Sequence, residues 1–266
     1  MIKNPNRSLW NKYEDGAESR GKLVARLLSA RIDLPSARIL DIGCGAGGIA
    51  VALARAGASV KAFDPDPDKI QQAKQLAQAF DNVEFRLGDL VNETNSGYDV
   101  IILNDVLEHI GNPDVTLRFC ADNLKKDGLL YITTPNKYSI INILCDPHYS
   151  LPFVALLSRK RVKSIIAGLL QWHNKQKRDF PQLFSFKQIK SLLGQNHFDW
   201  ELLNTTAARL AFKEPEMLWS RPSHLFIIKT IKWFKLEKIF IKLINNGHGF
   251  FNKFINPTWF ILATKV

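Results

Sequence analysis

Short apolar runs alternate with helix-forming segments along the first half of the chain. The apolar runs predict five buried strands, over Ala37–Ile42, Ser59–Asp64, Asn82–Arg86, Tyr98–Asn104 and Gly128–Thr133. The segments around them predict four helices, over Ser8–Ser29, Gly48–Ala56, Pro67–Ala79 and Pro113–Leu124. This order is typical of βαβ units, so the sequence predicts an α/β fold with a parallel sheet and helices on both faces.

The alternation breaks after Asn136. Apolar clusters are interleaved with basic residues over 137–185 and again over 211–257, so both stretches are interpreted as insertions. Outside them, the pattern predicts one more helix and two more strands, over Phe186–Leu193, Trp200–Thr205 and Thr258–Thr264.

The positive charge is concentrated in the second half of the chain. The 266 residues carry a formal net charge of +11. Residues 1–136 hold 16 Lys and Arg against 18 Asp and Glu, whereas residues 137–266 hold 20 against 7. Such asymmetry indicates a nucleic acid, an anionic membrane or an acidic substrate as a partner. A lysine-rich surface that only keeps the protein in solution is the plainer alternative.

The number of cysteines and the lack of long apolar segments indicate the cellular compartment of the protein. Cys44, Cys120 and Cys145 are odd in number and form no CxxC or Cys/His cluster, so we expect neither a disulfide framework nor a zinc site. The N-terminus lacks the apolar run of a secretory signal, and no stretch of about 18 residues is apolar enough to span a bilayer. We therefore expect a cytoplasmic protein.

A glycine-rich loop joins the first predicted strand to the helix after it. It has the sequence DIGCGAGG over residues 41–48. Glycines let the backbone approach a ligand closely, and the N-terminus of the following helix presents free N–H groups to an anionic group. Any tight strand-to-helix turn favours glycine, so the loop alone is a weak signal.

Acidic residues follow the next two strands. Asp64-Pro65 ends the second strand, and Gly88-Asp89-Leu90 follows the third. The carboxyl ends of parallel strands meet at one edge of a sheet, where ligands bind. At that edge Asp64 can accept both hydroxyls of a ribose, and Asp89 can accept a hydrogen bond from an adenine amine. Together with Asp41, these residues indicate a nucleoside-containing cofactor.

The loop differs from the dinucleotide-binding GxGxxG and resembles the first motif of class I S-adenosylmethionine-dependent methyltransferases. The positions of Asp64, of Gly88-Asp89 and of Tyr98-Asp99 are also similar to that family. So is the segment NDVLEHI over residues 104–110. Residues 127–130 resemble the turn before the fifth strand, with Asp127 in place of a glycine. The resemblance covers residues 37–136.

This resemblance implies a Rossmann-like sheet of seven strands, with the last strand antiparallel and supplied by Thr258–Thr264. It also implies S-adenosylmethionine as cofactor and S-adenosylhomocysteine as product. The expected cofactor-binding residues are Asp41, Gly43 and Gly45 at the methionine part, Asp64 with Pro65 at the ribose, Asp89 and Leu90 at the adenine, and Asn104 at the sulfonium.

The expected organisation follows from the sheet and the two insertions. Residues 1–136 form the cofactor-binding half of a methyltransferase domain, and 137–185 form a first insertion. Residues 186–210 return to the core, 211–257 form a second, basic insertion, and 258–266 supply the last strand. The two insertions together are expected to form a helical cap.

A hydroxyl acceptor would gain from a general base or a metal ion that lowers its pKa. We predict His109 and His148 as catalytic residues, because His109 follows the fourth strand and His148 lies in the first insertion. The segment DVLEH is most similar to ubiquinone-type O-methyltransferases, which have EVxEH there and can use a divalent cation. Asp105 replaces their first Glu, so we expect no metal and keep a divalent cation as the alternative. Local hydrogen bonding by Glu108 and His109 is the plainer interpretation.

The second insertion contains the segment HLFIIKTIKWFKLEKIFIKLI over His224–Ile244, which predicts one basic amphipathic helix. Phe226, Trp233 and Phe240 recur every seven residues, and lysines cover roughly the opposite half. Such a helix is typical of membrane-surface or partner binding. We expect an anionic membrane surface as a partner, on the inner face of the membrane. The alternative is a cap whose apolar face packs on the core.

The sequence therefore predicts S-adenosylmethionine-dependent methyl transfer to an oxygen of a hydrophobic or lipid-like small molecule. A sugar or a secondary metabolite is the alternative acceptor. A non-catalytic membrane-binding module of the same fold is the alternative from another class. No RNA-binding motif accompanies the charge, so nucleic acid is not expected as a partner. The oligomeric state is left open.

Overall fold

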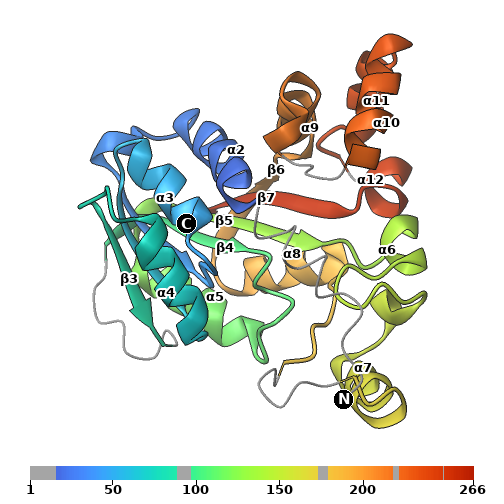
Figure 1. Ribbon diagram of the computed structural model, residues 1–266, viewed down its shortest axis with the longest axis horizontal. Coiled ribbons are helices and arrows are strands. Elements are labelled where there is room, and N and C mark those ends of the chain that lie inside the picture. The colour runs from blue at the N-terminus through green and yellow to red at the C-terminus, as the bar shows by residue number, and fades with distance from the viewer. Residues whose placement is uncertain (1–15, 89–96, 173–178, 218–221, 248) are drawn as a thin grey trace.

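The computed structural model describes residues 16–88, 97–172, 179–217, 222–247 and 249–266 (Figure 1). Within them, one seven-stranded sheet has the strand order β3-β2-β1-β4-β5-β7-β6. The strands are β1 (Arg38–Ile42), β2 (Ser59–Asp64), β3 (Val83–Leu87), β4 (Tyr98–Asn104), β5 (Leu124–Pro135), β6 (Phe198–Leu202) and β7 (Thr258–Lys265). The pairs among β1 to β5 are parallel, and β7 runs antiparallel to both β5 and β6. The predicted Rossmann-like sheet with an antiparallel last strand is confirmed.

Helices cover both faces of this sheet because its central strands carry buried, mostly apolar side chains on both faces. Successive side chains of a strand point to opposite faces, and Ile39 and Leu40 of β1 accordingly enter two different core clusters. The first cluster includes apolar residues of α2 (Ala17–Ser29), α3 (Gly48–Arg55) and α4 (Pro67–Leu76). The second includes residues of α5 (Pro113–Asn123) and α8 (Phe186–Gln195).

Most predicted elements of the core agree with the structure within a few residues, and two differ. The strand expected over Trp200–Thr205 is Phe198–Leu202, because helix α9 (Asn204–Lys213) starts two residues later. The Asn204 side chain accepts a hydrogen bond from the Phe260 N–H at 2.9 Å, which fixes this corner. Helix α9 also runs across the boundary expected between residues 210 and 211. In the expected helix over Ser8–Ser29, residues 8–15 lie outside the described residues.

Strand β5 begins four residues before the expected Gly128. Its first residue, Leu124, pairs with Tyr98, and the register then shifts so that Leu129 pairs with Val100. Asp127 lies in the bulge that this register shift produces. Its φ is 62°, in the left-handed region that Gly, Asn and Asp adopt most readily. This explains how Asp127 can stand where the related turn has a glycine.

The first insertion forms a small layer of its own beyond the end of β5. It contains α6 (Ile140–Leu144), η3 (Val154–Leu156), α7 (Arg159–Lys163) and η4 (Ser164–Leu169). Val154, Val162 and Ile166 form a separate buried cluster beneath them. This layer lies on the same side of the molecule as the second insertion (Figure 1).

The described residues of the second insertion include the end of α9, the short turn η5 (Pro215–Met217) and the helices α10 (Pro222–Trp233), α11 (Glu237–Ile244) and α12 (Phe250–Phe254). The prediction of one continuous helix over His224–Ile244 is therefore wrong. The chain turns at Lys235, whose φ of 56° no α-helix allows, and α11 then packs against α9 and α12. Among the described residues, none of the helices combines the length and the apolarity needed to cross a bilayer.

Candidate functional site

The glycine loop lies at the carboxyl end of β1, where the chain order of the sheet reverses between β2 and β4. The Gly43 and Cys44 N–H groups donate to the Phe63 carbonyl at 2.8 and 2.9 Å, which holds the loop against β2. Gly43, Gly45 and Gly47 all have positive φ. A Cβ on Gly43 would lie 2.5 Å from a Val106 methyl, whereas a Cβ on Gly45 would meet no heavy atom within 4 Å. Gly45 thus borders open space that a ligand could fill.

Asp41 lies beneath this loop and is almost completely buried. Its Oδ2 atom has no hydrogen-bond partner among the described residues. Burial, and to a lesser degree the neighbouring Asp64, raises the pKa of Asp41 to about 7. A buried carboxylate without a donor is costly, so this atom fits a cationic ligand group such as the ammonium of S-adenosylmethionine.

Asp64 ends β2 and faces the same loop. It accepts the Gly45 N–H at 2.8 Å on one oxygen and the Asp66 N–H at 2.9 Å on the other. A carboxylate offers about four lone-pair sites, so ribose hydroxyls could still bind Asp64. Burial raises the pKa of Asp64, and the two N–H donors oppose that shift. Pro65 is exposed beside it.

Asn104 occupies the corresponding place at the end of β4, and its amide donates to Asp105 at 3.3 Å. The structure therefore brings Asp41, Gly43, Gly45, Asp64 and Asn104 to one edge of the sheet, on three neighbouring strands. Asp89 and Leu90, predicted at the adenine, lie outside the described residues. Their placement at this edge stays a prediction.

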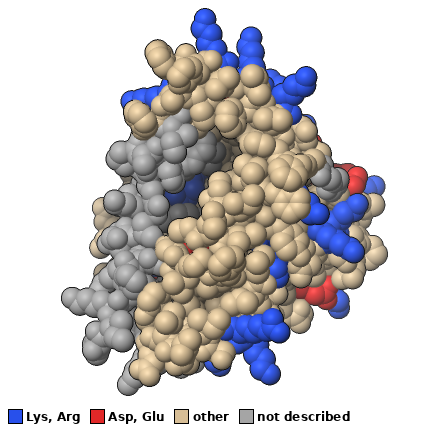
Figure 2. Space-filling model, turned by 90° about the vertical axis from the view of Figure 1, so that its right-hand side faces the viewer, with Lys and Arg blue, Asp and Glu red and all other residues tan. Residues whose placement is uncertain are grey.

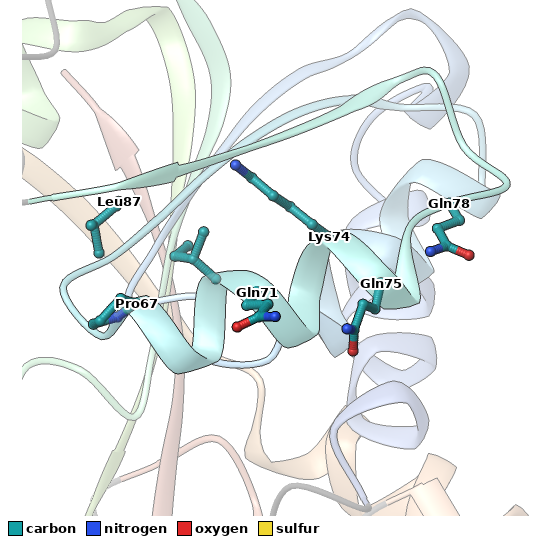
Figure 3. A pocket seen from close by; sticks show the side chains of 7 residues that line it. Pro67, Gln71, Lys74, Gln75, Gln78 and Leu87 are labelled. Carbon is teal, nitrogen blue, oxygen red and sulfur yellow. The ribbon is translucent and has the colours of Figure 1, made fainter.

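A groove of about 420 Å³ lies elsewhere, along α4 and the edge strand β3 (Figure 3). Pro67, Ile70 and Leu87 form its apolar part, and Lys74 extends across it (Figure 3). The rest of its lining is glutamine. No buried charged group points into this groove, so the cofactor site is better placed at the glycine loop.

The loop after β4 carries the predicted catalytic residue His109. Its Nδ1 atom lies 2.5 Å from Oδ2 of Asp179, and the imidazole is partly exposed. Because a carboxylate can only accept, Nδ1 carries the hydrogen, and Nε2 is the nitrogen that would take a proton. Asp179 was not predicted from the sequence, since it lies near the end of the first insertion and belongs to no recognisable motif.

His148, the other predicted catalytic residue, is buried close to His109, with the two ring centroids 5.0 Å apart. Its Nε2 lies 3.9 Å from Oε1 of Glu108, which is fully buried. The other Glu108 oxygen accepts the Thr134 hydroxyl at 2.9 Å. Burial, with repulsion from Asp105, raises the pKa of Glu108 to about 7.

This group of side chains differs from the one that the sequence resemblance implies for a cation. Ligand atoms of Glu108, His109 and His148 lie within 4.8 Å of one another. Asp105 instead accepts the Thr133 hydroxyl at 3.0 Å. Two imidazoles and a carboxylate suit a divalent transition metal better than Mg²⁺, and Glu108 Oε1 has no hydrogen-bond partner among the described residues.

Arg159 of the first insertion holds the loop after β4 in place. Its guanidinium donates to the carbonyls of Glu108, His109 and Ile110 at 2.8, 3.0 and 2.7 Å. Gln182 adds a backbone hydrogen bond to the Glu108 carbonyl at 2.9 Å. The sequence showed Arg159 only as part of a basic run, so its role could not be read from the pattern.

The arrangement can position a nucleophile beside a methyl donor. The glycine loop and Asp41 fit a cofactor at β1, while His109 lies after β4, the adjacent strand. A base at that place can take the proton from an acceptor hydroxyl.

Comparisons with known proteins identify the family of the chain. The profile of a methyltransferase domain family matches residues 14–203. A segment of 114 residues is 36% identical to a ubiquinone biosynthesis O-methyltransferase of Xanthomonas campestris pv. campestris and covers 41% of this chain and 48% of that protein. The matched segment thus spans about half the length of the curated relatives.

Solved structures share the fold at low sequence identity. A magnesium protoporphyrin IX methyltransferase of Synechocystis PCC 6803 with bound S-adenosylmethionine has a TM-score of 0.52 and 16% identity, over 96% of this chain and 83% of that chain. An S-adenosylmethionine-dependent methyltransferase of Mesorhizobium loti has a TM-score of 0.56 and 13% identity, over 91% and 96%. With the profile match over most of its length, the chain belongs to the methyltransferase domain family.

Proposed function

We propose that the protein transfers a methyl group from S-adenosylmethionine to an oxygen of a hydrophobic small molecule. The observation that carries the proposal is the pairing of two sites at one sheet edge. A glycine loop with the buried Asp41 lies at the end of β1. His109 lies in the loop after the neighbouring strand β4, where it is hydrogen-bonded to Asp179. The name of the curated relatives, ubiquinone biosynthesis O-methyltransferase, supports oxygen as the acceptor atom.

Most of the catalytic contribution of this chain would be positioning and proton removal. When bound, S-adenosylmethionine supplies a methyl group on a sulfonium, which is already a strong electrophile. Asp41 would hold the cofactor's ammonium, and Asp64 would hold its ribose. His109 Nε2 would accept the proton of the acceptor hydroxyl as its oxygen bonds to the methyl carbon, while the bond from that carbon to sulfur breaks and S-adenosylhomocysteine is left. Asp179 would stabilise the resulting imidazolium.

The surroundings of the site support a hydrophobic acceptor. The first insertion presents Ile140, Ile141 and Leu144 of α6 and Phe153 to solvent, each at least 46% exposed. Large apolar groups that stay exposed usually mark an interaction site. We propose that the acceptor is lipid-like and is reached at the surface of an anionic membrane.

The test uses purified protein, tritiated S-adenosylmethionine and a cell extract, with the label partitioned between organic and aqueous phases. We expect label in the organic phase, and none with Gly45→Val, whose side chain would fill the space beside the loop. Label only in the aqueous phase would contradict the lipid-like acceptor and favour a sugar, a secondary metabolite or RNA. Cofactor binding without any label would favour a non-catalytic module of the same fold.

The variant His109→Gln removes the proposed general base and leaves the proposed cofactor-binding residues in place. We expect kcat to fall by about 10²-fold, the usual contribution of a general base, with unchanged affinity for S-adenosylmethionine. A variant with wild-type turnover would contradict the role of His109.

A divalent cation is a second candidate for activating the acceptor, because Glu108, His109 and His148 converge. These three residues would hold it, and it would lower the pKa of the acceptor hydroxyl. Equilibrium dialysis with Mn²⁺ and Zn²⁺ tests this without any activity measurement. The candidate predicts one bound ion per chain, lost in His148→Ala; no retained ion would eliminate it.

A further inference from the structure

We propose that helices α10, α11 and α12 form a docking face for an anionic lipid bilayer. This role rests on the proposed function, since a lipid-like acceptor would be reached through that surface. The three helices lie beyond residues 14–203, the part that the family profile matches, so the face is a feature of this chain's own second insertion.

The face presents large apolar side chains to solvent. Phe226 and Trp233 of α10 and Phe250 of α12 are 71%, 76% and 71% exposed. Phe234, Ile239 and Leu243 are also exposed. Trp233 and Phe234 stack edge to face with their centroids 4.6 Å apart, which holds both rings outward together. We call these six residues, with the lysines described next, the lysine–aromatic face.

Lysines lie among these apolar groups rather than opposite them, which corrects the arrangement expected from a single helix. The exposed lysines are Lys229, Lys232, Lys235, Lys238, Lys242 and Lys253. On α11, Lys238, Ile239, Lys242 and Leu243 are exposed, while Glu237, Phe240, Ile241 and Ile244 are partly covered. On α10, Ile228 is buried, and Phe226, Lys229 and Trp233 lie on the other side of the helix.

The charge of this face has a single sign. Glu237 is the one acidic residue in the sequence between 218 and 257. The described residues show no ion pair for the lysines of α10 and α11. Figure 2 views the side of the molecule that carries the two insertions: Lys and Arg project at its top, right and lower margins, with a few Asp and Glu at the right, and the surface between them is mostly uncharged. A group of lysines with few acidic neighbours favours an anionic partner.

The mixture of lysine and aromatic side chains identifies that partner as a lipid surface. The centre of a protein–protein interface is depleted of lysine, whereas here lysines lie within one helical turn of the exposed rings. At a bilayer, lysines reach the anionic headgroups while tryptophan, phenylalanine and isoleucine enter the interface. Each lysine near an anionic surface adds roughly a fivefold gain in binding, so several together suffice for stable association.

The neighbouring α6 extends the apolar part of this surface. The Ser139 hydroxyl, just before α6, donates to the Ile255 carbonyl after α12 at 3.0 Å. Asn142 of α6 donates to the Pro257 carbonyl at 2.7 Å. These bonds fix α6, with its exposed Ile141 and Leu144, beside α12. A bilayer at the lysine–aromatic face would therefore also lie close to the first insertion, which carries His148 and Arg159.

The test is cosedimentation of the full chain with vesicles of phosphatidylcholine alone or with 30% phosphatidylglycerol, at low and high salt. We expect binding to the anionic vesicles only, weakened at least tenfold in high salt. The triple variant Lys232→Glu, Lys238→Glu, Lys242→Glu should bind at least a hundredfold more weakly. Trp233→Ser with Phe250→Ser should weaken binding at either salt concentration, because it removes the apolar contribution.

A matched control carries the same charge change on another part of the molecule. Lys22, Lys74 and Lys126 are exposed on α2, α4 and β5, and their triple change to Glu should leave vesicle binding within about threefold. Equal binding by the two triple variants, or none by the wild type at low salt, would overturn the proposal. So would tighter binding to single-stranded RNA than to vesicles. S-adenosylmethionine binding and methyl transfer, measured separately, report on the proposed function whatever the vesicles show.

Discussion

At the scale of single residues, Asp41 links the protonation of the site to cofactor binding. The pKa of this buried carboxyl is about 7, so below pH 7 it holds its proton and cannot pair with an ammonium. Cofactor binding should therefore release a proton at pH 6, and the affinity for S-adenosylmethionine should fall about tenfold between pH 8 and pH 6. Isothermal titration calorimetry in buffers of different ionisation enthalpy measures both.

Asp41→Asn provides the control for this linkage. The variant should bind the cofactor weakly with no pH dependence between 6 and 8. Without cofactor it should be more stable than the wild type at pH 8, because a carboxyl with a raised pKa loses folded-state stability as the pH rises through it. Retention of the wild-type pH dependence would assign the proton to another group.

Two glycines of the same loop should respond differently to alanine. Gly43→Ala combines a φ of +71° with a contact of 2.5 Å to Val106, so it should lose more than about 2 kcal/mol of stability. Gly45→Ala has open space around its Cβ and should lose only about 1 kcal/mol, but it should weaken cofactor binding at least tenfold. Urea unfolding and calorimetry separate the two effects. Full cofactor affinity in Gly45→Ala would rule out the loop as the cofactor cradle.

Asp179 is predicted to position His109 and stabilise its protonated form. Asp179→Asn should lower kcat about tenfold with little change in KM. It should also move the acidic limb of the pH–rate profile to lower pH, because the carboxylate no longer favours the imidazolium. Asp199→Asn, at an exposed carboxylate of β6, is the matched control. A parallel loss of kcat with an unmoved pH profile would show that Asp179 is only structural.

The residues of the candidate site differ in how far their surroundings could be predicted from neighbouring sequence. Asp41, Gly43, Gly45 and Asp64 lie at the carboxyl ends of strands with a recognisable pattern or directly after them, so their meeting at one edge of the sheet could be predicted, and their roles stay predictions. Asp179 could not, because its contact with His109 depends on how the first insertion folds back. The same holds for His148, which could be named a candidate although its approach to Glu108 could not be foreseen.

At the scale of elements, the sheet follows from apolar periodicity, whereas the insertions depend on packing. The segment over His224–Ile244 has helical composition throughout, and nothing in it marks Lys235 as a turn. After this turn α11 packs against α9 and α12, and such tertiary contacts are not visible in the local sequence pattern. Tertiary packing overrides local propensity at this point, and it also places lysines and aromatics on one exposed side.

Substitutions of Arg159 test whether the first insertion stabilises the loop after β4. Its guanidinium donates to three carbonyls of the loop after β4, so Arg159→Ala leaves them without these donors. We expect a loss of about 2 kcal/mol in urea unfolding and a clear fall in kcat. Arg159→Lys should recover little, since an ammonium lacks the planar set of donors. Arg161→Ala, on the exposed side of α7, should leave both quantities near wild type.

At the scale of the whole molecule, Asn136 is a point where the sheet and both insertions are joined. Asn136 follows β5 and is almost completely buried. Its amide donates to the carbonyls of Asn252, Lys253 and Asn256 at 3.1, 3.0 and 2.8 Å, and its own carbonyl accepts from Asn142 of α6. The end of the strand next to β4 therefore fixes α6 and α12 together.

Asn136→Asp tests this connection, because it keeps the shape and replaces two N–H donors by an acceptor. At pH 8 the carboxylate would face three carbonyl oxygens, and we expect a loss of about 3 kcal/mol in urea unfolding together with faster proteolysis within α10 to α12. Burial disfavours the charged form, so its pKa should be raised and the loss should be smaller at pH 5 than at pH 8. Asn123→Asp, whose amide donates only within α5, is the matched control. Equal stability of the two variants at pH 8 would show that the insertions are held to the core by other contacts.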